Sequence, residues 1–197
     1  MAARLLLLRH AATAGAGSSR LVGASDLPAS PQGLRDLERL AGVLSAFQPE
    51  AWFCSPLLRA RQTMARLEEL AGTSLAAIVD ERLREIDFGR WEMRSFAEIA
   101  ATDQDLIPAW SEYTNFTFPG GEPVAGFRGR VAGILADLRA SAQREVAVVS
   151  HGGVIRTLIC LALGLDPKQY LLFDVRPGSL AVLDLFQGGA VLAGLNL

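Results

Sequence analysis

Short runs of apolar residues alternate along this chain with longer stretches in which apolar residues recur every three or four positions. Residues 5–8 and 145–150 are such runs, closed by polar residues, and residues 51–54 form a third. Apolar runs of this length are typical of strands buried on both faces of a parallel sheet. We therefore predict a strand at each of these three places and a further short strand at 75–79.

Helical periodicity fills the stretches between the predicted strands. Residues 31–44 follow Ser30, a residue type at which helices commonly begin, and place a proline at the first helical position. Residues 57–70, 124–138 and 154–163 show the same spacing of apolar side chains. Strands that alternate with helices predict a three-layer α/β/α sandwich around a mostly parallel central sheet.

The C-terminal part of the chain changes character. Residues 171–175, 179–186 and 190–195 are β-like, and Pro-Gly and Gly-Gly pairs that favour turns separate them. We expect one antiparallel strand at the edge of the sheet. The chain, 1–197, is predicted to form a single domain, in which residues 88–121, where the helical period is lost, form an inserted, partly helical lid.

Composition narrows the classes of protein to which the chain can belong. Of its 197 residues, 50% are hydrophobic, which supplies the apolar surface of a folded core and excludes a disordered chain. The formal net charge of −2 argues against the clustered basic residues of a general nucleic-acid-binding surface. The apolar N-terminal run ends at Arg9, too early for a signal peptide or a membrane span, so we expect a cytoplasmic protein without nucleic-acid or membrane partners.

The two cysteines, Cys54 and Cys160, are too few and too far apart for a disulfide framework or a zinc motif. Both lie in apolar runs and are expected to be reduced core residues. The acidic residues do not cluster at the spacing of metal ligands. The sequence therefore predicts neither a metal site nor a cofactor.

The candidate chemistry begins with the histidines. The chain has two, His10 and His151, and each directly follows a predicted strand. Ligands of open α/β sheets bind beyond the carboxyl ends of the strands, so this placement favours a common site. The alternative is that both imidazoles only form hydrogen bonds within the fold.

Two arginines lie at comparable places. Arg9 precedes His10, and Arg59 lies at the start of the helix that follows the strand at 51–54. The helix dipole favours anions at a helix start, so an arginine there is better explained by a bound anion, although a surface salt bridge is the alternative for Arg59. Guanidinium groups bind phosphate oxygens bidentately, and an imidazole can act as a nucleophile, so the set predicts a phosphoryl pocket.

These residues lie in four segments that carry a family resemblance. Residues 8–13 (LRHAAT) resemble the RHG-x-T signature of the histidine phosphatase superfamily, also called phosphoglycerate mutase-like. Residues 55–63 (SPLLRARQT) resemble its second phosphate-binding motif, residues 83–92 (LREIDFGRWE) its L-x-E-x-x-x-G-x-W-E segment, and residues 149–153 (VSHGG) its closing histidine motif. Order and spacing match over nearly the whole chain, which implies a phosphoglycerate mutase-like fold.

The resemblance implies a role for each residue at the core of the site. His10 would be the residue that becomes phosphorylated, and Glu85 the proton donor to the leaving group. The phosphate pocket would be formed by Arg9, Arg59 and His151. Asp87 lies two residues beyond Glu85 and would share a face with it in an extended segment, so it is the competing acid.

Five further residues are candidates for substrate binding: Thr13, Arg20, Trp91, Glu122 and Gly152. Thr13 could donate a hydroxyl group to phosphate oxygens, and Arg20 could approach the substrate from the long loop at 11–29. The aromatic residues of the lid either line the mouth of the pocket or form the lid's own small core. Glu122 either helps close the pocket or stabilises the start of the next helix.

Residues 88–94 and 173–179 are similar to those of α-ribazole phosphatases, so the expected partner is a small-molecule phosphate ester such as α-ribazole 5'-phosphate. Phosphoglycerate mutase and broad-specificity phosphatase are the enzymatic alternatives. Ala11 stands where the family has glycine, and Ala16 is nearest to its usual asparagine, which leaves a weakly catalytic phosphate-binding or regulatory module as a third reading. The apolar C-terminal strands could form the interface of a homodimer.

Overall fold

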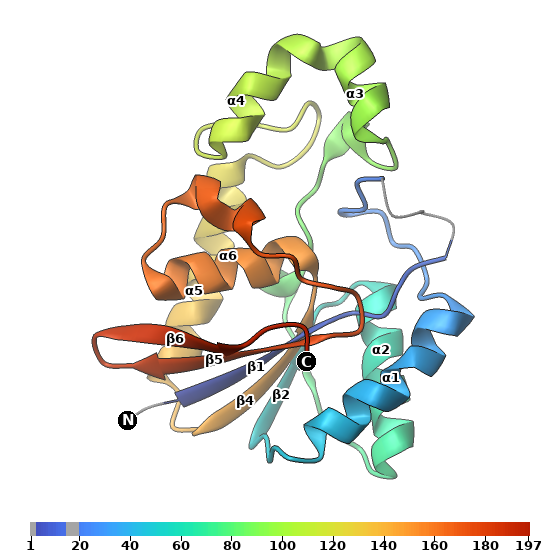
Figure 1. The fold of residues 1–197 in the computed structure, drawn as a ribbon, viewed down its shortest axis with the longest axis vertical. Helices are drawn as coiled ribbons and strands as arrows, with labels where there is room; N and C mark the ends of the chain where they lie inside the picture. Colours follow the sequence, from blue (N-terminus) through green and yellow to red (C-terminus); the bar gives the residue numbers. More distant parts are fainter. Residues whose placement is uncertain (1–2, 15–19) are drawn as a thin grey trace.

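A six-stranded sheet runs through the molecule, and helices cover both of its faces (Figure 1). The computed structural model describes residues 3–14 and 20–197. In sheet order the strands are β3 (Ile78–Val79), β2 (Ala51–Cys54), β4 (Glu145–Ser150), β1 (Ala3–Arg9), β5 (Leu180–Phe186) and β6 (Gly189–Gly194).

Six α-helices and four short 3-10 helices connect these strands in the described part of the chain. The α-helices are α1 (Pro31–Leu44), α2 (Leu58–Ala71), α3 (Phe96–Asp103), α4 (Ile107–Glu112), α5 (Val124–Ala140) and α6 (Gly152–Leu163). The 3-10 helices are η1 (Glu81–Leu83), η2 (Gly89–Trp91), η3 (Gln104–Leu106) and η4 (Pro167–Leu172). No described helix is long and apolar enough to cross a membrane.

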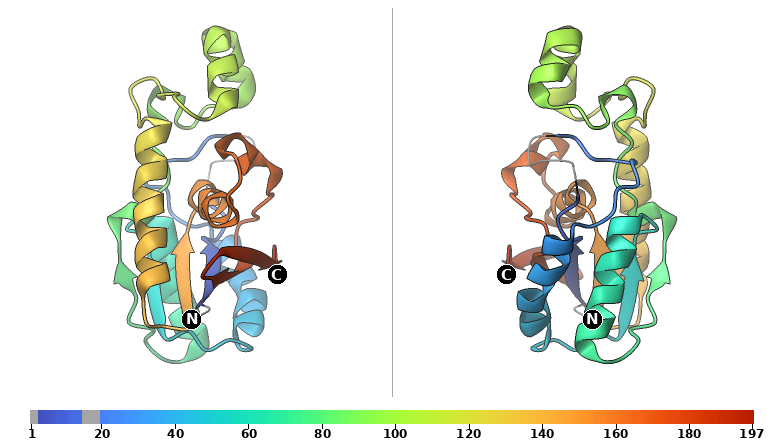
Figure 2. Two further views of the ribbon diagram at one scale, coloured as in Figure 1. Left: turned by 90° about the vertical axis from the view of Figure 1, so that its left-hand side faces the viewer. Right: turned by 90° about the vertical axis from the view of Figure 1, so that its right-hand side faces the viewer.

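The four leucines of β1 explain why helices must cover both faces of the sheet. Successive side chains of a strand point to opposite faces, and all four of these leucines are fully buried. Leu6 and Leu8 belong to the apolar cluster that contains α1 and α2, whereas Leu5 and Leu7 belong to the cluster that contains α5 and α6. Figure 2 shows α1 and α5 on opposite sides of the sheet. The predicted three-layer α/β/α sandwich is thus confirmed.

The directions of the strands confirm the prediction of a mostly parallel sheet with antiparallel pairing at one edge. β1, β4, β2 and β3 are paired in parallel, and β5 runs antiparallel to β1. β6 then pairs antiparallel with β5 through a tight hairpin and forms the edge. The reversed strand is therefore one position inside the edge, because the Gly188–Gly189 turn folds the last residues back beside it.

The strand expected at 171–175 is absent, and this prediction was wrong. Residues 167–172 instead form η4, whose first turn is capped by the side chain of Asp166 and begins with Pro167. Gln169 completes a capping box with Asp166. Local capping of this kind satisfies the backbone groups of a helical turn and so outweighs the β propensity of the following leucines.

The 88–121 segment contains α3 and α4, which stand at one end of the molecule away from the sheet (Figure 1). Trp91 is fully buried at its centre, and its ring centroid lies 5.3 Å from that of Trp110 and 5.5 Å from that of Phe116. The indole Nε1 of Trp91 donates a hydrogen bond of 2.7 Å to Asp103. Trp91 is therefore a buried core residue, in an apolar cluster that continues from this segment into α5 and α6.

The two cysteines are free and buried, as predicted. Cys54 ends β2 and packs among the residues beneath α1 and α2, while Cys160 lies in α6 within the opposite cluster. Burial raises the pKa of the Cys54 thiol to about 12 and that of Cys160 to about 11. Both thiols therefore stay protonated at neutral pH and behave as small apolar side chains.

Candidate active site

A cavity of about 770 Å³ opens where β1 ends and α6 begins. The parallel register of β1 and β4 places Arg9 opposite Ser150, so the next residues, His10 and His151, leave the sheet side by side. Their ring centroids lie 5.0 Å apart. The sequence places both histidines after strands, and the sheet register is what brings the two rings together.

His10 is buried, with 6% of its surface exposed, and both of its ring nitrogens are engaged. Nδ1 lies 2.7 Å from the carbonyl oxygen of Ala11, and Nε2 lies 3.2 Å from Nε of Arg59. Because a carbonyl oxygen can only accept, Nδ1 carries the proton and Nε2 presents a lone pair. Burial and the nearby charges of Arg9 and Arg59 hold the pKa of His10 well below its usual value, so the ring is neutral.

Arg59 is completely buried in the first turn of α2. Its Nη2 donates to the carbonyl oxygen of Gly23 at 2.8 Å, and its Nη1 donates to that of Ser25 at 2.9 Å. Burial lowers the pKa of the guanidinium from its ordinary value, although a guanidinium remains charged at neutral pH. The surface salt bridge considered for Arg59 is excluded by this burial.

His151 has none of its surface exposed and is held by a serine. Its Nε2 lies 2.6 Å from Oγ of Ser55, and its Nδ1 has no hydrogen-bond partner among the described residues. Burial, followed by the nearby His10 and Arg59, holds its pKa well below the usual value. The site thus contains a second neutral imidazole with an unused ring nitrogen.

Arg9 reaches across the cavity wall to a loop before β5. Its Nη1 donates to the carbonyl oxygen of Val175, and its Nε has no partner among the described residues. Burial lowers the pKa of Arg9 to about 10, and the charge of Glu85 acts in the opposite direction. A Cβ atom on Gly152 would lie 3.3 Å from Cζ of Arg9, so the glycine at the start of α6 leaves room for this guanidinium.

Glu85 lines the cavity, and Asp87 does not. One Glu85 oxygen accepts the backbone N–H of Gly153 at 2.8 Å, and a Cβ atom on Gly153 would lie 2.4 Å from the other. The carboxylate of Asp87 instead accepts the backbone N–H of Gly89 at 2.8 Å. Glu85 is therefore the one of these two carboxylates that reaches the cavity lined by His10, and Asp87 is turned toward a backbone turn.

The five candidate substrate-binding residues separate into two groups. Thr13, Arg20 and Gly152 line the cavity. Arg20 is at its margin, where its guanidinium pairs with Glu98 at 2.9 Å. Trp91 and Glu122 do not line the cavity, and Arg59 and His151 lie beneath its surface, against His10.

Trp91 and Glu122 both have partners within the fold. Trp91 packs in the apolar cluster that also contains residues of β1, α5 and α6. Glu122 forms an ion pair of 2.8 Å with Arg130, whose Nη2 donates to the backbone carbonyl of Glu85. Glu122 thus contributes to the position of Glu85 through Arg130, at a distance from the cavity.

Ala11 fits the fold without strain. Its methyl group is fully buried in the cluster under α1 and α2, and it is not among the residues with a positive φ. Its backbone N–H donates to Oγ1 of Thr63 at 2.9 Å. An alanine is therefore compatible with the geometry of this turn, which leaves the carbonyl of Ala11 free to bind His10. Ala16 lies outside the described residues.

Several residues of the site had no role in the sequence analysis. Ser55 and Thr63 hold His151 and Ala11, and both lie within the 55–63 motif that carries part of the family resemblance. Arg156 lines the cavity from α6, and its Nε donates to the carbonyl oxygen of Phe173 at 2.7 Å. Its place in the helix that follows a site histidine is the signal by which it could have been found.

The mouth of the cavity is bounded by aromatic rings. Tyr113, at the end of α4, stacks on Tyr170 of η4 with 3.7 Å between ring centroids. Trp110 also lines the cavity and is half-buried. Trp110 and Tyr113 of the lid thus line the wall of the cavity together with Tyr170, and both tyrosines are also buried in the core.

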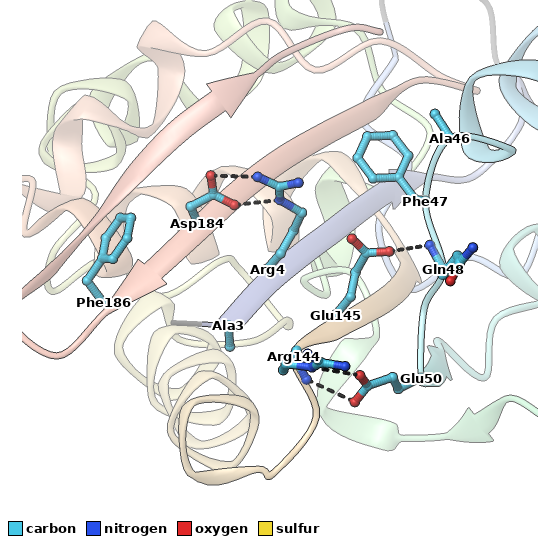
Figure 3. Close-up of a pocket in the computed structure, with 10 residues that line it drawn as sticks. All are labelled: Ala3, Arg4, Ala46, Phe47, Gln48, Glu50, Arg144, Glu145, Asp184 and Phe186. Atoms are coloured by element: carbon cyan, nitrogen blue, oxygen red, sulfur yellow. Dashed lines mark hydrogen bonds and ion pairs between the residues drawn. The ribbon is translucent and has the colours of Figure 1, made fainter. Parts of the chain in front are cut away.

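A second hollow, of about 580 Å³, lies at the opposite end of the sheet (Figure 3). Its charged groups neutralise one another: Arg4 pairs with Asp184 at 2.7 Å, and Arg144 pairs with Glu50 at 3.4 Å. Glu145 accepts the backbone N–H of Gln48. Paired side chains of this kind offer little to a ligand, so the cavity beside the histidines is the stronger candidate. Across residues 3–14 and 20–197, no group of three or more histidine, cysteine or acidic residues could hold a metal ion.

Comparison with known proteins agrees with this geometry. The family model described as histidine phosphatase superfamily (branch 1) matches residues 5–197. The adenosylcobalamin/alpha-ribazole phosphatase of Salmonella typhimurium is 30% identical over 195 residues, which cover 98% of this chain and 96% of the relative. Phosphoserine phosphatase 1 of Hydrogenobacter thermophilus is 29% identical over 196 residues, covering 98% and 92%. The native structure of mycobacterial glucosyl-3-phosphoglycerate phosphatase matches with a TM-score of 0.86 at 30% identity and covers 100% of this chain and 99% of that one.

The neutral histidines give the folded state a defined pH dependence. Both pKa values lie well below the ordinary 6.5, so the unfolded chain takes up protons below that pH and the folded protein does not. The free energy of unfolding is therefore expected to fall as pH decreases below 6.5, by at most about 1.4 kcal/mol per pH unit for each histidine.

Urea denaturation between pH 7.5 and 5 measures this slope. Because the chain has two histidines, the double variant His10→Gln/His151→Gln removes the whole contribution, and the carboxylates common to both proteins cancel in the difference. Equal slopes in the two proteins would contradict the neutral, desolvated state of the imidazoles.

Proposed function

Because the chain belongs to the histidine phosphatase superfamily and is a phosphatase, we propose that it hydrolyses small phosphate monoesters through a phosphohistidine on Nε2 of His10. One observation carries the proposal. Nδ1 of His10 is bound to the carbonyl of Ala11, so the ring presents the lone pair of Nε2 beside Arg59 at the inner end of the cavity. A neutral imidazole in this orientation is a competent nucleophile toward phosphorus.

The groups around His10 fit a phosphoryl dianion. Arg9 and Arg59 supply two positive charges that backbone carbonyls orient, and His151 supplies a ring nitrogen without a partner. When a phosphoryl group binds, Nε of Arg59 can transfer its hydrogen bond from Nε2 of His10 to a phosphoryl oxygen. That exchange frees the attacking lone pair at the moment when the charge on the equatorial oxygens needs stabilisation.

The reaction proceeds in two balanced steps. In the first, Nε2 of His10 forms a bond to phosphorus, the bond from phosphorus to the ester oxygen breaks, and that oxygen takes a proton from the carboxyl group of Glu85. In the second, a water molecule attacks phosphorus, its proton passes to the Glu85 carboxylate, and the bond between nitrogen and phosphorus breaks to release orthophosphate. Neither step requires a metal ion, since the cationic side chains carry the charge of the transferred group.

The physiological ester that we propose is α-ribazole 5'-phosphate, which carries a nucleoside-like group. Trp110, Tyr113 and Tyr170 line the cavity and offer aromatic surface to such a group. A relative that is similar over nearly its full length is named for this ester. A phospho-acid, as in the phosphoserine phosphatase relative, is the second candidate, and the cavity-lining guanidinium of Arg156, near enough to Arg9 to lower its pKa, favours it.

The proton donor can be tested by changing the leaving group. Glu85→Gln is expected to lower kcat/KM for an alkyl phosphate by about 10²–10⁴-fold, because an alkoxide leaves only when it is protonated. The loss should be much smaller for p-nitrophenyl phosphate, since p-nitrophenolate leaves without a proton. Asp87→Asn is the matched control and should stay near wild type on both. Equal losses on both esters in Glu85→Gln would refute the assignment.

The covalent intermediate can be trapped. Rapid quenching of the protein with a phosphorus-32-labelled ester in the presence of a chelator should give label that is stable to alkali and labile to acid, as a phosphoramidate is. His10→Ala should carry no label. A wild-type protein that binds orthophosphate but neither hydrolyses an ester nor becomes labelled would instead be a binding module. Loss of activity in the chelator that a divalent ion restores would contradict the metal-free mechanism.

A phosphate-release screen decides among the substrates. We expect kcat/KM to be highest for α-ribazole 5'-phosphate in a panel that also contains phosphoserine, nucleoside monophosphates and sugar phosphates. A preference for phosphoserine that Arg156→Ala removes would establish the second candidate. Conversion of 3-phosphoglycerate to 2-phosphoglycerate with little free orthophosphate would identify a mutase.

A further inference from the structure

The carboxylate of Glu92 lies against a row of backbone N–H groups. It accepts from Gly23 at 3.1 Å, Ala24 at 2.9 Å and Ser25 at 3.3 Å, and also from Phe88 at 3.0 Å. Three consecutive amides that converge on one anion form a backbone nest, a geometry that stabilises negative charge. Glu92 does not line the cavity, so it has no contact with a substrate there.

The opposite side of the same backbone segment holds Arg59. The carbonyl oxygens of Gly23 and Ser25 accept from its Nη2 and Nη1 at 2.8 and 2.9 Å. The third donor of the same guanidinium, Nε, reaches Nε2 of His10 at 3.2 Å. The peptide group that joins Gly23 to Ala24 therefore lies between a carboxylate and the guanidinium that faces the nucleophile, because its N–H binds Glu92 and its carbonyl binds Arg59.

The absence of a side chain at Gly23 allows the 23–25 backbone to pack directly against its neighbours. A Cβ atom there would lie 2.1 Å from the carbonyl oxygen of Ile86 and 2.3 Å from Oε1 of Glu92. No side chain fits between the segment and the carboxylate. The contact between Glu92 and the nest is thus direct, and a shift of the carboxylate moves the segment with it.

We propose that Glu92 is a positioning residue for phosphate binding: its carboxylate fixes the 23–25 backbone, whose carbonyls in turn fix Arg59 beside His10. The carboxylate bound to the N–H of Ala24 polarises the peptide group that also contains the Gly23 carbonyl, and so makes that carbonyl a stronger acceptor for the guanidinium. The inference rests on the proposed function, because it assigns Glu92 to the positioning of a group that binds the phosphoryl oxygens.

The indirect arrangement has a chemical advantage. A carboxylate paired directly with Arg59 would compete with the phosphoryl group for the same N–H donors and would cancel the positive charge at the nucleophile. Glu92 acts through neutral peptides, so the guanidinium is oriented while its charge remains available to a dianion. The charge of Glu92 still favours the ionised form of Arg59, whose pKa it raises against the effect of burial.

A double-mutant cycle between Glu92 and Arg59 tests the inference. In Glu92→Gln the amide replaces one accepting oxygen with an N–H donor, so the 23–25 segment loses part of its support. We expect the Kd for orthovanadate, measured by calorimetry, and the KM for p-nitrophenyl phosphate to rise about 10-fold or more. In the Arg59→Ala background the same change should alter the Kd less than about 2-fold, because the group that it positions is absent.

The control is a carboxylate that also accepts a backbone N–H from a loop but lies away from the cavity. Glu68 in α2 accepts the backbone N–H of Leu75 at 2.9 Å, and Glu68→Gln should leave the Kd for orthovanadate unchanged. An equal loss from Glu92→Gln with and without Arg59 would show a merely structural role and overturn the inference, as would a Kd like that of wild type.

The experiment also distinguishes a folding defect from a loss of positioning, and failure of the proposed function from failure of the role of Glu92. If Glu92→Gln does not fold, Glu92→Asp enters the same cycle, because it keeps the charge but is too short to reach all the amides. A wild-type protein that neither binds orthovanadate nor hydrolyses an ester refutes the proposed function. A wild-type protein that does both, with no coupling between positions 92 and 59 in the cycle, refutes only the role of Glu92.

Discussion

The parallel pairing of β1 with β4 is the constraint on which the rest of the site depends. Its register sets Arg9 opposite Ser150, and the two histidines that follow leave the sheet with their rings 5.0 Å apart. Burial of both imidazoles beside guanidinium groups keeps them neutral. The folded protein thus concentrates positive charge and desolvated polar atoms at one point, an arrangement that is unfavourable by itself and that a phosphoryl dianion relieves.

Both site arginines are oriented by neutral acceptors. Arg9 donates to the carbonyl of Val175, and Arg59 to those of Gly23 and Ser25. Carbonyls direct a guanidinium without cancelling its charge, whereas the arginines of the hollow at the other end of the sheet are paired with carboxylates (Figure 3). The two hollows therefore differ in charge balance. Within the part of the chain that the structure describes, the positive charges of Arg9 and Arg59 have no carboxylate paired with them, as suits a site for an anion, whereas the arginines of the other hollow are paired.

Much of the fold and the centre of the site could be predicted from the sequence. Apolar runs and helical periodicity located the main strands and helices, and the position of His10 and His151 after strands indicated a common site. The helix η4 could not be predicted in the same way, because the Asp166 cap decides it locally. The contacts of Trp91 with Asp103 and of Glu122 with Arg130 could not be predicted either, because these partners are recognisable only once the chain is folded. The hydrogen bonds of the Glu92 carboxylate could not be predicted for the same reason, since a sequence pattern does not show which backbone N–H groups a side chain contacts.

The buried guanidinium groups of Arg9 and Arg59 also affect the release of the product. In the proposed mechanism these groups bind the phosphoryl oxygens, and orthophosphate presents the same oxygens as the ester from which it came. Nothing in that part of the pocket distinguishes reactant from product, so retention of the product is an inherent property of the chemistry. The rate of such an enzyme in a cell would depend on the orthophosphate concentration as well as on the supply of its ester. A high orthophosphate concentration would occupy the pocket and slow the reaction that releases more orthophosphate.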